Sequence, residues 1–121
     1  MRVLVAMLAV CGLFVGAAPV EAQNIPSFVT ADALYKDCKG PREICGGYIA
    51  GVADHDNDMV SVMTQAHIAM PAQFCIPKAK TLHQVTDAFT TFIDSHAGAR
   101  PSVASEVVVV ALHDAFPCPT K

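Results

Sequence analysis

Basic residues are scarce in this sequence. Eight Lys and Arg face eleven Asp and Glu among 121 residues, and the formal net charge is -3. Because neutralising phosphates requires clustered Lys and Arg, this balance argues against nucleic-acid binding. Charged residues make up only 16% of the chain and hydrophobic residues 53%, enough apolar surface to offset the entropy of ordering, which argues against disorder. The length allows one domain.

Motifs for catalysis and metal binding are also missing. No C-x-x-C, C-x-x-H or H-E-x-x-H spacing occurs, although zinc sites use such spacings, and there is no nucleophile elbow. The acidic run at 54–58 resembles the opening of a calcium loop, but Met59 replaces the sharp-turn Gly and Gln65 the closing Glu. We therefore expect no enzyme, no cofactor and no metal, and interpret the histidines as surface residues: His55, His67, His83, His96 and His113.

The one long apolar run stands at the N-terminus. Met1 and Arg2 give a short positive start, residues 3–18 are apolar apart from two glycines, and Val20-Glu21-Ala22 ends the run with small residues at the -3 and -1 positions. This pattern predicts a signal peptide over residues 1–22. The run is shorter than the roughly 20 residues that span a bilayer, and no second run follows. We therefore expect export to the periplasm without a membrane anchor after cleavage.

Export changes how the cysteines are interpreted. Cys11 is expected to leave with the signal peptide, so the mature chain keeps an even number. An oxidising compartment favours pairing the four remaining cysteines into two disulfides. Three pairings are possible, and the sequence does not select among them: Cys38, Cys45, Cys75 and Cys118.

The first half of the mature chain predicts two helices. Thr30 is a good N-cap for a helix that begins at Ala31. Pro41 suits the first position of a second helix, in which apolar residues recur every four positions from residue 44 to 52. Glycines 46, 47 and 51 are unfavourable inside a helix, so we expect another backbone to pack closely there. Beyond residue 58 the helical pattern continues less clearly until Met70-Pro71 requires a break.

The second half predicts two more helices. Thr81 and Gln84 form a T-x-x-Q capping box, followed by an apolar stripe from residue 82 to 93. Residues 95–102 indicate a turn. Residues 103–116 contain four consecutive valines, which are compatible with a buried strand, but the apolar spacing favours a helix. We therefore predict an all-α fold: a small disulfide-stabilised bundle of about four helices.

Several of these elements together resemble a known family. The resemblance covers residues 28–118 and rests on Leu34 with Cys38, and on the stretches C-G-G-Y-I-A-G-V-A-D (45–54), F-C-I-P (74–77) and A-L-H-D-A-F-P-C (111–118). In this order they resemble the Rap/Tai family of amidase-immunity proteins of type VI secretion. The resemblance implies a small helical periplasmic protein, often a homodimer, that binds a peptidoglycan amidase and covers its cleft. The matched residues are largely scaffold.

An inhibitor needs no catalytic site, and a stiff scaffold loses little conformational entropy on binding. Our hypothesis for the partner contact is the acidic stretch with Asp54, Asp56 and Asp58, together with the connection 64–74, because these are polar or irregular segments. A solvated acidic face is the plainer interpretation of the stretch. The alternative function is a periplasmic acid-stress chaperone of the HdeA kind or another exported binding protein, and five titratable histidines are compatible with it.

Overall fold

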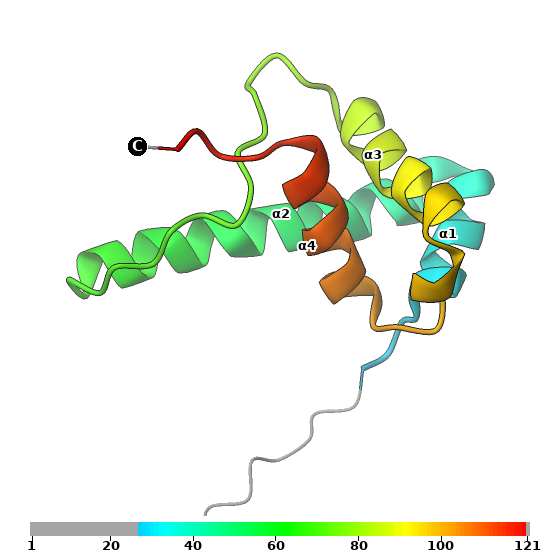
Figure 1. Ribbon diagram of the computed structural model, residues 1–121, viewed down its shortest axis with the longest axis horizontal. Coiled ribbons are helices and arrows are strands. Elements are labelled where there is room, and N and C mark those ends of the chain that lie inside the picture. Colours follow the sequence, from blue (N-terminus) through cyan, green and yellow to red (C-terminus); the bar gives the residue numbers. More distant parts are fainter. Residues whose placement is uncertain (1–26, 121) are drawn as a thin grey trace, which may run out of the picture.

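The computed structural model describes residues 27–120, so the predicted signal peptide lies outside the described residues. The described chain is all-α, as the sequence predicted. It forms α1 (Ala31–Lys39), α2 (Arg42–Gln65), α3 (Leu82–Ser95), a short 3-10 helix η1 (Ala97–Ala99) and α4 (Ala104–Ala115). Figure 1 shows α1, α3 and α4 gathered beside one half of the long helix α2.

Helix α1 begins as its sequence predicts. The Thr30 hydroxyl accepts a hydrogen bond from the Ala33 amide at 3.3 Å, and Asp32 lies in the favourable first turn. Leu34 is buried against the other helices. The prediction that Pro41 is the first residue of the second helix is wrong by one position, because Pro41 is the N-cap of α2.

Helix α2 is continuous through the acidic stretch and ends before Met70-Pro71 is reached. His67 has a positive φ of 58°. Its amide donates to the Thr64 carbonyl, and the next amide, of Ile68, donates to the Met63 carbonyl at 2.9 Å. These two bonds form a Schellman motif, which usually has Gly in the left-handed position. A histidine there is why this helix end is hard to predict.

Helices α3 and α4 confirm the two predictions for the second half. Both hydrogen bonds of the Thr81–Gln84 capping box are present at the start of α3. The valine-rich segment is helical, with Val107 and Val108 buried. A single antiparallel bridge pairs Thr30 with Val103, so the starts of α1 and α4 are tied together.

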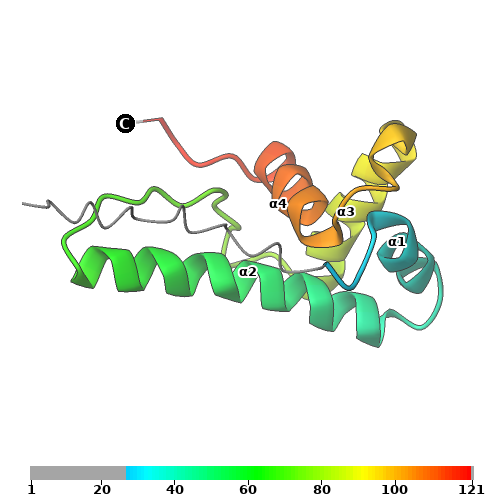
Figure 2. The same ribbon diagram turned by 90° about the horizontal axis from the view of Figure 1, so that it is seen from below.

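The core lies where α1, α3 and α4 meet the N-terminal half of α2. Its largest fully buried side chains include Phe89, Leu34, Ile49, Ile93 and Leu112. The buried residues of α2 all lie between positions 45 and 56. The remainder of α2 therefore projects beyond the core, and the connection to α3 runs back along it (Figure 2).

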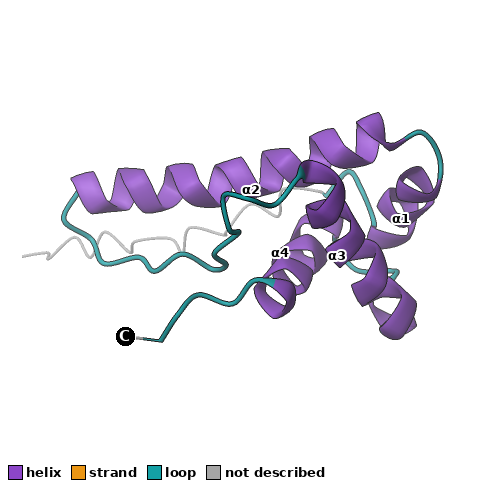
Figure 3. Cartoon of the chain, turned by 90° about the horizontal axis from the view of Figure 1, so that it is seen from above, coloured by secondary structure: helices purple, strands orange, loops and turns teal. Residues whose placement is uncertain are grey.

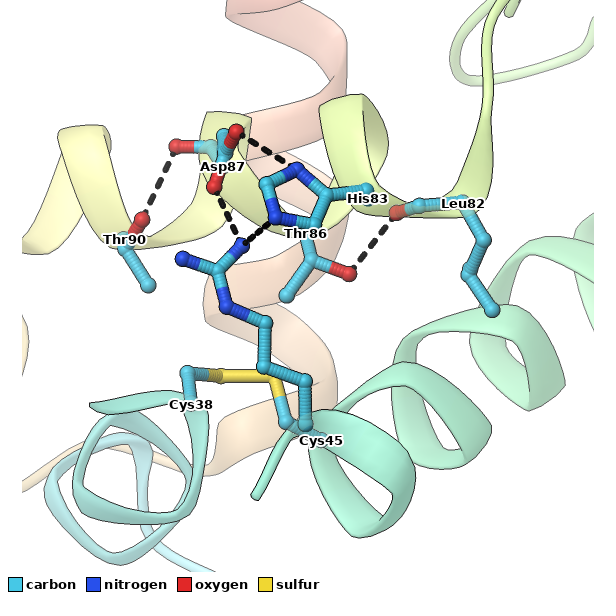
Figure 4. Close-up of a disulfide and its surroundings, with 8 residues drawn as sticks. Cys38, Cys45, Leu82, His83, Thr86, Asp87 and Thr90 are labelled. Carbon is cyan, nitrogen blue, oxygen red and sulfur yellow. Dashed lines mark hydrogen bonds and ion pairs between the residues drawn. A yellow bond between two sulfur atoms is a disulfide. The ribbon is translucent and has the colours of Figure 1, made fainter. Parts of the chain in front are cut away.

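Two disulfides resolve the cysteine pairing. The first bridge joins Cys38 to Cys45 across the turn between α1 and α2, and both cysteines are buried. The second bridge joins Cys75, in the connection, to Cys118, beyond α4. Figure 4 shows the first bridge with His83 and Asp87 of α3 nearby. Arg42 of α2 donates to both of these residues, to His83 at 2.8 Å and to Asp87 at 2.7 Å. Over residues 27–120, no helix combines the length and apolar character needed to cross a bilayer.

Candidate functional site: a groove beside a projecting arm

A groove of about 850 Å³ lies between α2 and α4 and is bordered by the connection that follows α2. Figure 3 shows α4 beside the middle of α2, with the connection passing close to both. Helix α2 supplies one side of the groove with Gly47, Tyr48, Gly51, Val52, His55, Asp56 and Met59. The other side comes from the connection and α4, with Met70, Gln73, Ser105, Glu106 and Val109.

The glycines of α2 do not all do what the sequence predicted. A Cβ at Gly46 would lie 3.3 Å from the Leu82 side chain, so this glycine does allow close packing within the fold. A Cβ at Gly47 or Gly51 would meet nothing within 4 Å. The expectation of a closely packed backbone is therefore wrong for these two, which instead leave the floor of the groove open.

The three aspartates of the acidic stretch are placed differently. Asp54 and Asp58 are exposed. Asp56 is only 4% exposed and lines the groove, where its Oδ2 accepts a hydrogen bond from the Gln73 amide at 3.3 Å. Oδ1 is buried, and no donor in residues 27–120 reaches it. Buried polar atoms are nearly always hydrogen-bonded, so a buried carboxylate oxygen without a donor is an unusual feature in the lining of this groove.

The wall formed by the connection is held in place. Phe74 is buried, and the Cys75 amide donates to the Phe116 carbonyl at 2.8 Å. His113 Nδ1 donates to the Gln73 carbonyl at 2.6 Å. The second bridge adds a covalent tie at the same place. The wall is therefore fixed although it has no regular secondary structure.

Beside the groove, the end of α2 and the first residues of the connection form a projecting arm, defined here as residues 57–69. Most of its side chains are exposed. Two of them are large and apolar, with Val62 48% and Ile68 56% exposed. Exposed apolar side chains on a projecting element are typical of interaction sites.

The contacts that lower the pKa of a carboxyl group lie outside the groove and arm. Hydrogen bonding lowers the pKa of three aspartates: Lys36 does so for Asp32, Arg42 for Asp87, and the Tyr35 hydroxyl for Asp94. The last two contacts join α3 to other helices. These carboxylates therefore tie neighbouring elements of the fold together.

The histidines are all exposed, as expected for surface residues. Across the described part of the chain, no three His, Cys, Asp or Glu side chains gather into a group able to hold a metal ion. Tyr48, Glu106 and Val109 were not singled out from the sequence as site residues. From the sequence, the glycine spacing and Asp56 of the acidic stretch pointed to this side of α2.

The family model described as Rap1a immunity proteins matches residues 30–118. No curated protein matches the chain. No solved structure matches it.

Proposed function

The chain belongs to the Rap1a immunity protein family, and we propose that it binds and inhibits a peptidoglycan amidase delivered into the periplasm by type VI secretion. Family membership gives the coarser role, immunity against a secreted effector. The amidase target, the periplasmic site and the inhibitory rather than catalytic activity are our proposal. They rest on the Rap/Tai resemblance and on the predicted signal peptide.

The observation that carries the inhibitory role is the arm. A narrow helical projection with exposed Val62 and Ile68 has the shape and chemistry to enter or cover a cleft in another protein. Exposed Asp54 and Asp58 lie at its base. We propose that these aspartates contact the effector, because charges near the edge of an interface steer encounter and help to set its orientation.

Titrating the purified protein into the amidase effector, with isolated cell-wall sacculi as substrate, tests this function. Amidase activity, followed as released peptide, is expected to fall to zero near equimolar protein. The double variant Asp54→Lys, Asp58→Lys is expected to need at least about tenfold more protein. The control is Glu43→Lys, an exposed acidic residue at the opposite end of the same helix.

Each outcome bears on a different part of the proposal. Full amidase activity at a large excess of wild-type protein would exclude inhibition. Wild-type inhibition by the double variant would exclude the two aspartates and leave the function standing. Osmotic-shock fractionation, with mass spectrometry of the N-terminus, tests periplasmic export and cleavage before Gln23.

We also propose that the protein forms a homodimer. Large apolar side chains outside the arm and groove stay exposed at the starts of α2 and α3, with Ile44 71% and Leu82 49% exposed. A second copy burying them would gain about 25 cal/mol for each Å² of apolar surface removed from water. Sedimentation equilibrium of the wild type against Ile44→Glu tests this, and a wild-type monomer at high concentration would refute it.

A further inference from the structure

The buried carboxylate of Asp56 carries an inference about what the groove binds. Burying a charge is unfavourable unless the charge is paired and hydrogen-bonded. Here one oxygen has the Gln73 amide, and the other has no donor in the described structure. A binding site whose occupant brings the missing donor explains this arrangement.

The charges around Asp56 indicate what kind of donor is missing. Glu106 is the other acidic side chain along the groove, His55 is the one histidine in the lining, and none of the lining residues is Lys or Arg. The groove is therefore complementary to a cation. Most other lining side chains are apolar, including Val52, Met59 and Val109, so the cation must come on a body that also buries apolar surface.

The floor of the groove indicates the shape of the occupant. Gly47 and Gly51 leave open space where a side chain would stand, so a polypeptide backbone can approach α2 there. Tyr48 offers an aromatic ring nearby. A guanidinium is planar, weakly hydrated, stacks on aromatic rings and donates in a fork, which suits it to a desolvated carboxylate better than an ammonium.

We propose that the groove binds an apolar segment of the effector through an arginine whose guanidinium donates to the Asp56 carboxylate, which turns about χ2 so that the buried Oδ1 meets it. The identity of the occupant as the effector rests on the proposed function. The recognition of arginine by the groove does not, and it can be measured without any effector.

The test uses the purified, oxidised protein labelled with ¹⁵N and a short probe peptide, acetyl-Ala-Leu-Arg-Leu-Ala-amide. The control peptide has citrulline in place of arginine, which keeps the shape and removes the charge. We expect the arginine peptide to shift the amide resonances of Gly47, Gly51 and Gln73, and to bind about tenfold more tightly than the citrulline peptide. Equal affinities, or shifts confined to other surfaces, would overturn the proposal.

Two variants check that Asp56 and the groove are responsible. Asp56→Asn is expected to abolish the preference for arginine over citrulline. Gly51→Leu fills the open floor and is expected to abolish binding of both peptides, while Asn57→Leu, an exposed position on the same helix outside the groove, leaves binding unchanged. If Asp56→Asn does not fold, Gly51→Leu still decides the location, since unchanged binding by it would refute the groove.

The effector is tested separately. Asp56→Asn should raise the concentration needed for half inhibition of the amidase about tenfold. If arginine recognition holds in the peptide assay but inhibition is unchanged, the effector is not the occupant. If the variant instead turns a dimer into a monomer, the occupant is a second copy, and the proposal fails in favour of self-association.

Discussion

Alanine at Gly47 or Gly51 is expected to stabilise the protein. Both glycines lie inside α2, no described glycine has a positive φ, and the added methyl group would meet nothing within 4 Å. Gly in a helix interior is less favourable than Ala by about 1 kcal/mol. Each substitution should therefore raise the free energy of unfolding by about 1 kcal/mol, which corresponds to a rise in Tm of about 4–8 °C for a domain of this size.

Gly46→Ala provides a matched control in the same helix. Its Cβ would lie 3.3 Å from the Leu82 side chain, tighter than ordinary van der Waals contact. Leu82 must move before the helix preference is gained, so we expect a smaller increase than at Gly47 or Gly51. Urea unfolding followed by circular dichroism at 222 nm, with disulfides intact, measures the three midpoints, and the slope m should stay constant.

A loss of stability in Gly47→Ala or Gly51→Ala would refute this reasoning, because it would mean that their faces are covered after all. Equal gains in all three variants would show that contact with Leu82 has no influence. The same proteins also separate stability from binding. If the open floor receives the effector, Gly51→Ala should be more stable than the wild type and yet inhibit the amidase less well, a trade-off that is common at binding sites.

Three further predictions concern the scaffold. The second bridge closes a loop with a sequence separation of 43, so replacing both of its cysteines should lower the free energy of unfolding in urea by about 4 kcal/mol in the chain-entropy model. During reduction of the native protein, alkylation and mass spectrometry should show this partly exposed bridge opening before the buried first bridge. Thr81→Ala removes one half of the capping box and should cost about 1 kcal/mol, whereas alanine at the exposed Thr91 within the same helix should have little effect. The pKa values of Asp32, Asp87 and Asp94 are lowered in the folded state, so these carboxylates stabilise the fold above their unfolded pKa and lose this effect as they are protonated. The free energy of unfolding should therefore fall as the pH is lowered below about 4. Urea midpoints measured from pH 7 to 2.5 test this, and no decline would refute it.

The starts of α1 and α3 could be predicted because they depend on local chemistry. Thr30 and the Thr81–Gln84 pair satisfy free amides through their own side chains, and these contacts involve residues only three positions apart. The end of α2 depends on a left-handed residue instead. Because that residue is His67 rather than Gly, the sequence contained no signal before Met70-Pro71.

The site was harder to predict because it depends on which faces stay uncovered. Glycine spacing in α2 indicated a close approach of backbone, but the group that packs closely against Gly46 is the Leu82 side chain. At Gly47 and Gly51 nothing in the described chain comes within 4 Å of the position that a Cβ would take. Likewise, alternating aspartates indicate a solvated face, but a helix turns 100° per residue, so Asp56 faces inward while Asp54 and Asp58 face outward.

The groove and the arm are best understood as one surface. A specific protein interface buries about 1,200–2,000 Å² in total, and the groove together with the exposed residues of the arm offers more surface for it than the groove alone. Met59 belongs to the arm and also lines the groove, and the hydrogen bond from Gln73 to Asp56 ties the returning connection to α2 at their junction. A partner that pairs with Asp56 therefore binds where the arm meets the core. The most buried part of such an interface would be the carboxylate, and the exposed apolar residues of the arm would extend it into the partner.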